Sequence, residues 1–170
     1  MEPGLERLNS LPPKEAEAEF GKCCGSTNWA RRMAVECPFA NANQLMTIAD
    51  RVWWSLEPDD WLEAFASHPK IGEKKAARAT TAEAETWATQ EQSGARDAAE
   101  ETVRSLTELN REYEDKFGYI FIVCATGKSS DELLTNLRER LPNDAEAELR
   151  IAAREQARIT KLRLGKVIQQ

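Results

Sequence analysis

The chain holds a single histidine, His68, in the stretch FASHPKIGEKK at residues 65–75. Imidazole has an ordinary pKa close to neutrality, so His68 is the first candidate for proton-transfer chemistry, although many histidines are loop residues without a chemical role. Two other features could complete a pocket: the adjacent Glu91 and Gln92, and Arg163 within an apolar helix face. An imidazole, a carboxylate, an amide and a guanidinium together suit a small, polar, anionic substrate.

Arg163 interrupts the apolar side of the last predicted helix. At about 100° per residue, that side is formed by Leu149, Ala152, Ala153, Gln156, Ile159, Thr160 and Val167, and another side by Arg150, Arg154, Arg158 and Lys161. A guanidinium among apolar residues must extend out to solvent, pair with an internal carboxylate or face a polar cavity that holds an anion. The sequence leaves these three alternatives open.

The elements that would position these residues are helices, because helix start signals recur and strand patterns do not. In chain order, the predicted helix starts lie at Ser10–Pro13, Ser26 or Thr27, Asn41 or Asn43, Pro58, Thr80, Ala95, Ser129 and Asn143. The helix after Pro58 should bury Trp61, Leu62 and Phe65 and deliver His68 to its end. We therefore predict an all-α, single-domain helical bundle of about eight to nine helices that spans residues 1–170.

One segment departs from the helical pattern. YIFIVCA, at 119–125, has the composition of a buried strand, but no comparable second run exists to pair with it. We therefore predict an extended buried connector near 119–126, with some backbone N–H and C=O groups left for a ligand. CATGKSS resembles the end of a phosphate-binding loop, but Ile122 stands where that motif needs its first glycine. A nucleotide-dependent enzyme is therefore a weaker alternative.

Composition limits the partners and the compartment. The 23 Lys and Arg against 29 Asp and Glu give a net charge of -6, so nucleic acid is not an expected partner. No apolar run is long enough to span a bilayer, the N-terminus lacks the pattern of a signal peptide, and VIQQ is not a peroxisomal signal. We expect a cytoplasmic protein with reduced cysteines and no membrane partner. Cys23, Cys24 and Cys37 with His68 match no usual zinc spacing, so no metal site is predicted.

Four motifs together resemble the OHCU decarboxylase family: SHPKIG, TQEQSG, FGYIFIVCATGKS and ITKLRL. This family acts on 2-oxo-4-hydroxy-4-carboxy-5-ureidoimidazoline in the oxidation of urate to allantoin, and the resemblance covers nearly the whole chain. It implies an all-helical fold, a small-molecule substrate, no metal or organic cofactor, a homodimer, and (S)-allantoin as the product. A non-enzymatic helical protein-interaction domain is the principal alternative.

The same resemblance implies a role for individual residues. His68 would be the catalytic acid or base, with Glu91 and Arg163 in the same catalytic set. The substrate-binding residues would be Pro69, Ala88, Thr89, Gln90, Glu91, Gln92, Ile120, Phe121, Ile122, Val123, Cys124 and Arg163. Related sequences often have proline where this chain has Ile120, and often serine near Thr89, which preserves the hydroxyl.

Overall fold

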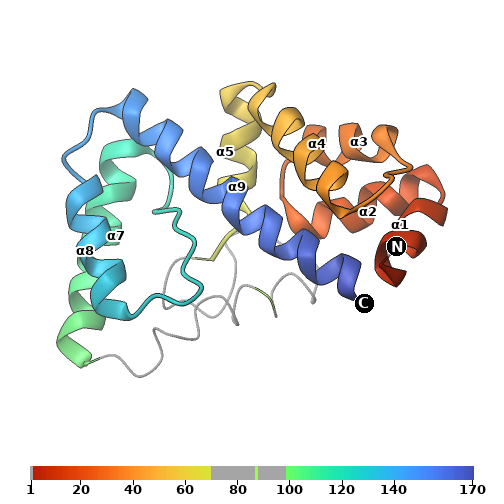
Figure 1. Ribbon diagram of the computed structural model, residues 1–170. Helices are drawn as coiled ribbons and strands as arrows, with labels where there is room; N and C mark the ends of the chain where they lie inside the picture. The colour runs from red at the N-terminus through yellow and green to blue at the C-terminus, as the bar shows by residue number, and fades with distance from the viewer. Residues whose placement is uncertain (1, 70–86, 88–98) are drawn as a thin grey trace. The chain divides into compact units, whose positions relative to one another are not determined.

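The computed structural model describes residues 2–69, 87 and 99–170, and this part of the chain is all-helical (Figure 1). It contains eight α-helices and no β-strand, which confirms the predicted fold class. The helices are α1 (Pro3–Ser10), α2 (Pro13–Cys23), α3 (Thr27–Glu36), α4 (Ala42–Trp54), α5 (Pro58–Ala66), α7 (Glu100–Phe117), α8 (Ser130–Arg140) and α9 (Ala145–Gln169). The helix predicted to start at Thr80 lies outside the described residues.

The described helices belong to two compact units. Unit 1 comprises Met1–Ala64 and Ala157–Gln170, and unit 2 comprises Phe65–Gln156. Helix α9 contributes its first part to unit 2 and its last part to unit 1. The expectation of one domain over residues 1–170 stays a prediction.

Most helices begin where the sequence signals predict. Ser26, Asn41 and Ser129 each accept, through the side-chain oxygen, the backbone N–H three residues ahead, at the heads of α3, α4 and α8. Such a cap satisfies an N–H group that has no partner within the helix. Pro13 occupies the first position of α2, and Pro3 does the same for α1, a helix that was not predicted.

The cap of the last helix differs from the prediction by one residue. Asp144, rather than Asn143, caps α9, because Asp144 Oδ1 accepts the Ala147 N–H at 2.9 Å. The Asn143 side chain is instead engaged by a buried carboxylate: its Nδ2 donates to Glu148 Oε1 at 3.3 Å. A hydrogen bond to a buried carboxylate five residues ahead has thus replaced the capping bond.

Helix α5 leads directly to His68, as predicted. Trp61 and Phe65 are buried, but Leu62 is 37% exposed, which corrects the expectation that it faces inward. Trp61 and Phe65 are four residues apart and share a face, whereas Leu62 lies about 100° around the helix from Trp61. Beyond the helix end, the backbone N–H of His68 donates to the Phe65 carbonyl at 3.2 Å, which fixes where the loop begins.

Unit 1 packs around aromatic rings. Phe20 of α2 meets the Trp29 ring of α3 edge-on, with the ring centroids 5.9 Å apart. Trp29 Nε1 donates to the Ala49 carbonyl of α4 at 3.2 Å, so the polar atom of this buried ring is paired. The unit 1 part of α9 is tied to α4 by an ion pair between Lys161 Nζ and Asp50 Oδ2, 2.5 Å apart.

Unit 2 is built from α7, α8, the first part of α9 and the connector between α7 and α8 (Figure 1). Gly118, with a φ of 83°, ends α7 and turns the chain into this connector. Residues 119–126 form neither helix nor strand, as predicted. The core of the unit contains Leu106, Tyr113, Phe121, Val123, Ala125, Leu133, Leu134 and Leu137. The connector supplies every second residue of 121–125 to this core, whereas the intervening Ile122 and Cys124 are buried outside it.

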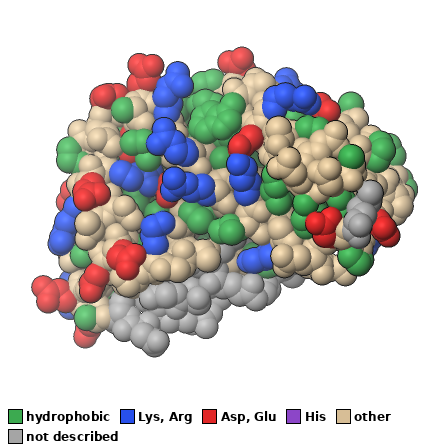
Figure 2. All heavy atoms as spheres, in the orientation of Figure 1, with side chains coloured by type: hydrophobic (Ala, Val, Ile, Leu, Met, Phe, Trp, Pro, Cys, Tyr) green, Lys and Arg blue, Asp and Glu red, His purple; other side chains and the backbone are tan. Residues whose placement is uncertain are grey.

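The two sides of α9 follow the prediction except at Leu149 and Lys161, which are both partly buried. Ala152, Ala153, Gln156, Ile159, Thr160 and Val167 are buried. Arg150, Arg154 and Arg158 are exposed, and Figure 2 shows Lys and Arg side chains at the surface over α9. Although α9 has 25 residues, none of the described helices combines the length and the apolar character that a membrane span needs.

Gly4 generates a test of unit 1, because it lies against the last turn of α9. A Cβ at Gly4 would lie 2.6 Å from the Ile168 carbonyl carbon and 2.7 Å from its Cα. Gly4→Ala should therefore force α1 away from α9 and lower the free energy of unfolding by about 1–3 kcal/mol. Gly21→Ala is the control, since a Cβ there meets nothing within 4 Å; this helix position should gain about 0.5–1 kcal/mol. Denaturant titration measures both, and equal stabilities would contradict the close contact.

Candidate functional site

The His68 side chain is buried and bound to a neutral amide. The imidazole Nε2 lies 2.6 Å from Gln156 Oε1, although the two residues are 88 positions apart in the chain. His68 is 8% exposed and Gln156 is 0% exposed, so water does not compete freely for this hydrogen bond. Pro69, the next predicted site residue, is partly buried.

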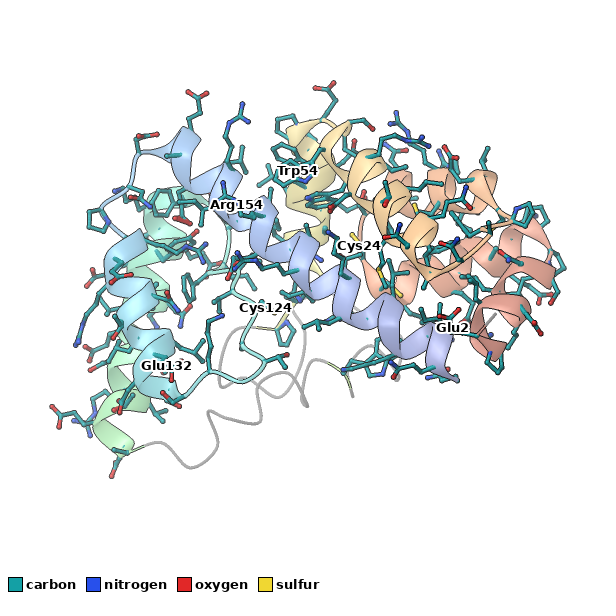
Figure 3. All side chains as sticks on the ribbon, viewed as in Figure 1. Glu2, Cys24, Trp54, Cys124, Glu132 and Arg154 are labelled. Carbon is teal, nitrogen blue, oxygen red and sulfur yellow. The ribbon has the colours of Figure 1, made fainter. Side chains whose placement is uncertain are left out.

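The residue before Gln156 holds the connector. Glu155 Oε1 accepts the Cys124 N–H at 3.4 Å, and Lys128 Nζ donates to the Cys124 carbonyl at 2.8 Å. Figure 3 labels Cys124 on the connector. Two adjacent residues of α9 thus bind two regions that the sequence predicts for the site: the histidine and the connector.

The connector backbone has donors without protein partners. Within the described part of the chain, the N–H groups of Ile122 and Val123 have no hydrogen-bond partner, and both residues are buried. The Ile122 carbonyl, in contrast, accepts from Arg140 Nη1 at 2.6 Å. Buried N–H groups in native proteins almost always have a hydrogen-bond partner. The N–H groups of Ile122 and Val123 are therefore available to a bound ligand or water.

Arg140 is the centre of a buried polar cluster. Its Nη2 and Nε donate to Glu148 Oε2 at 2.7 and 3.0 Å. Tyr113 donates its hydroxyl hydrogen to the same Glu148 oxygen at 2.5 Å. The guanidinium also lies over the Phe121 ring, 4.5 Å from its centroid. One cation therefore joins α7, α8, α9 and the connector, and it fixes the Ile122 carbonyl.

The groups of this cluster stabilise one another's protonation states. Burial would lower the pKa of Arg140, but its hydrogen bonds to Glu148, together with its interactions with Tyr113 and the Glu148 charge, offset this and raise that pKa. Burial raises the pKa of Tyr113, and the hydrogen bond to Glu148 adds to the rise. Tyr113 therefore stays protonated and remains a donor, while Arg140 stays charged.

This cluster was not predicted from the sequence, although helical spacing carries a signal for it. Arg140 lies seven residues after Leu133, so it falls on the buried side of α8. Glu148 lies four residues before the buried Ala152, and Glu155 three residues after it. Charged residues on an apolar stripe are the same signal that singled out Arg163.

Arg163 belongs to unit 1 and is 4% exposed. Its burial excludes extension to solvent, one of the three alternatives. Burial raises the pKa of the Cys24 thiol to about 11, against the opposing effects of the Ser26 backbone, Thr160 and the Arg163 charge. Arg163 thus lies close enough to Cys24, labelled in Figure 3, to affect its ionisation. A carboxylate partner and a polar cavity remain open as alternatives.

Five of the predicted site residues lie outside the described residues: Ala88, Thr89, Gln90, Glu91 and Gln92. Within the described ranges, no group of three or more His, Cys, Asp and Glu side chains is arranged to hold a metal ion. All four cysteines, Cys23, Cys24, Cys37 and Cys124, are free thiols. Nothing described here favours the nucleotide-binding alternative, because Lys128 binds the Cys124 carbonyl and the preceding segment is a connector between helices.

The Arg140 cluster generates a prediction about stability. Arg140→Met should lower the free energy of unfolding by about 3–5 kcal/mol, because it leaves the Glu148 carboxylate buried without a counter-charge. Arg138→Met, at an exposed position of the same helix, should change stability by less than about 0.5 kcal/mol.

Adding Glu148→Leu to Arg140→Met should recover part of the loss, since the uncompensated charge is then gone. Denaturant titration of the three variants measures the coupling. Strictly additive losses would contradict the ion pair.

Two relatives are informative. The chain is 36% identical over 152 residues to the uric acid degradation bifunctional protein TTL of Arabidopsis thaliana. The aligned region covers 89% of this chain and 47% of that protein. It is 30% identical over 172 residues to the 2-oxo-4-hydroxy-4-carboxy-5-ureidoimidazoline decarboxylase of Amia calva. This aligned region covers 97% of this chain and 94% of the Amia calva protein. The chain thus spans about half of the first relative and nearly all of the second.

Solved structures agree with this similarity. A crystal structure of OHCU decarboxylase in the presence of (S)-allantoin matches with a TM-score of 0.78 and 35% identity, over 90% of this chain and 99% of that one. A crystal structure of (S)-allantoin synthase matches with a TM-score of 0.72 at 18% identity, over 96% of this chain and 53% of that one, which shows a shared fold. The OHCU decarboxylase family model matches residues 9–165, so the chain belongs to the OHCU decarboxylase family.

Proposed function

We propose that this chain decarboxylates 2-oxo-4-hydroxy-4-carboxy-5-ureidoimidazoline (OHCU) to (S)-allantoin. The observation that carries the proposal is the hydrogen bond between His68, the chain's single histidine, and Gln156. Gln156 directly follows Glu155, which binds the connector at the Cys124 N–H. Membership of the family supports it. So does the Amia calva relative, which bears the name of this decarboxylase and aligns over 94% of its length.

The reaction can proceed without a cofactor. Breaking the bond to the carboxylate releases CO₂ and leaves the electron pair on the ring carbon that carried the carboxylate. The adjacent C=N of the substrate ring takes up this pair if its nitrogen is protonated or strongly hydrogen-bonded, so the substrate is its own electron sink. The protein then has to position the ring, stabilise the developing charge and deliver a proton to one face.

The roles of individual residues are part of the proposal. His68 acts as the general acid or base, and Glu91 completes the catalytic set with Arg163. We assign Arg163 to binding and orientation, because a tight grip on the departing carboxylate would stabilise the ground state and oppose its loss. Pro69 and residues 88–92 contribute to the pocket.

The connector completes the substrate pocket in this proposal. Its residues from Ile120 to Cys124 contact the substrate mainly through the backbone. The buried, unpaired N–H groups of Ile122 and Val123 support that role, since substrate carbonyl oxygens could accept from them.

We also propose that the protein is a cytoplasmic homodimer. The four free thiols suit a reducing compartment. Unit 1 exposes large apolar side chains that an interface would cover, among them Val35, 80% exposed, and Trp54, 41% exposed. Light scattering of the purified chain measures the assembly.

The function is tested by the chirality of the product. With freshly prepared urate oxidation products, added protein should speed the appearance of optically active allantoin. His68→Asn should remove most of this catalysed rate, by about 10²-fold or more for a lost general acid or base, while the thermal transition stays close to that of the wild type.

The protein-free reaction is the control. If rate and optical rotation match that control, the decarboxylase proposal is wrong and a non-enzymatic interaction domain is favoured. Wild-type activity in folded His68→Asn would contradict the role of the imidazole alone.

Arg163→Lys separates a functional arginine from a structural one. Lysine keeps the charge but loses the planar fork, so kcat/KM should fall by about 10-fold or more if the guanidinium orients an anionic substrate. Arg163→Met should lower the melting temperature if Arg163 is a structural partner of a carboxylate, and leave it unchanged or raise it if Arg163 serves the pocket. Arg154→Lys, on the exposed side of α9, is the control. Wild-type kcat/KM in both Arg163 variants would exclude the functional role.

A further inference from the structure

Gln156 is a polar residue on the apolar side of α9 to which the sequence analysis gives no task. Its side chain is 0% exposed, and its amide oxygen lies 2.6 Å from Nε2 of the His68 ring. A glutamine buried this deeply must satisfy its amide within the protein. The contact with His68 is a hydrogen bond slightly shorter than the usual range for a nitrogen donor and an oxygen acceptor.

This hydrogen bond restricts the imidazole. His68 lies beyond the last residue of α5, in the loop that follows the helix. Rotating the ring away from Gln156 would break this buried hydrogen bond. Gln156 is part of a long, regular helix, so this hydrogen bond ties the loop histidine to a rigid element.

The chemical type of the partner also matters. A carboxylate at position 156 would favour the charged imidazolium, whereas an amide carries no charge. The amide can accept from a protonated Nε2 through its oxygen, or donate to an unprotonated Nε2 through its nitrogen after a half-turn. The carboxylates on the same part of α9 have bonds of their own: Glu155 accepts the Cys124 N–H, and Glu148 is paired with Arg140.

We infer that Gln156 is the positioning residue of His68: it holds the ring through Nε2 in one orientation without fixing its charge. This inference rests on the proposed function, in which His68 transfers a proton. It assigns to Gln156 a task that neither a purely apolar residue nor an acidic one could perform.

The experiment uses the fact that His68 is the only histidine in the chain. Its imidazole NMR signals are therefore unambiguous, and they titrate without any contribution from other histidines. Gln156→Glu should raise the pKa of His68 by about one unit or more relative to the wild type, and the pH profile of kcat should move by the same amount. Gln169→Glu is the matched control, because it makes the same chemical change at an exposed position of α9 and should leave both unchanged.

Gln156→Met tests the orientation, since methionine has a similar volume and no hydrogen-bonding amide. It should lower kcat by about 10-fold or more through misplacement of the ring, with KM changed by less than about threefold. No pH should restore this loss. In Gln156→Glu, by contrast, kcat should recover at the pH where the ring regains the protonation state that is active in the wild type.

Two results overturn the inference alone: an unchanged His68 titration in Gln156→Glu, or wild-type kcat in folded Gln156→Met, while His68→Asn is inactive. Full activity of His68→Asn overturns the proposed role of His68, and the positioning role with it. A fall in kcat in both Gln156 variants without any shift in the His68 titration or in the pH profile identifies Gln156 as a structural residue only, and also overturns the inference.

Discussion

The ion pair between Arg140 and Glu148 is the constraint on which unit 2 depends. Glu148 is fully buried, and a carboxylate in that position is tolerable only with a charged partner and further hydrogen bonds. Arg140 supplies the charge, and Tyr113 supplies another donor. Since the three residues lie on three different helices, the electrostatic requirement of one carboxylate fixes how those helices pack.

The same cation explains why an apolar, strand-like sequence forms no sheet. An extended segment must find partners for its backbone groups, and a neighbouring strand is the usual source. Here side chains replace the strand: Arg140 binds the Ile122 carbonyl, Glu155 the Cys124 N–H, and Lys128 the Cys124 carbonyl. The connector can therefore run among helices with its apolar side chains alternating into the core.

Local signals in the sequence predicted much of this fold. Caps such as Ser26 and Ser129 act over three residues, and the alternation of polar and apolar sides on α9 follows from helical geometry alone. The absence of a second strand-like run was enough to predict a connector. These features depend on neighbours in the chain, which the sequence displays.

Partners distant in the chain could not be predicted in the same way. His68 and Gln156 are 88 residues apart, and nothing in the spacing of either identifies the other. The surroundings of Arg163 could not be predicted either, because a helical stripe shows which side of a helix is apolar but not which residues pack against that side.

The unpaired amides of the connector have an evolutionary consequence. The N–H groups of Ile122 and Val123 belong to the main chain, and every amino acid except proline supplies one. A substitution at either position alters the filling of space around these donors but leaves the donors themselves in place. Point mutations can therefore change the side chains around the Ile122 and Val123 N–H groups in small steps. Only a substitution by proline removes one of these donors. Such a surface can diverge widely in side-chain sequence between lineages while it presents the same pattern of hydrogen-bond donors.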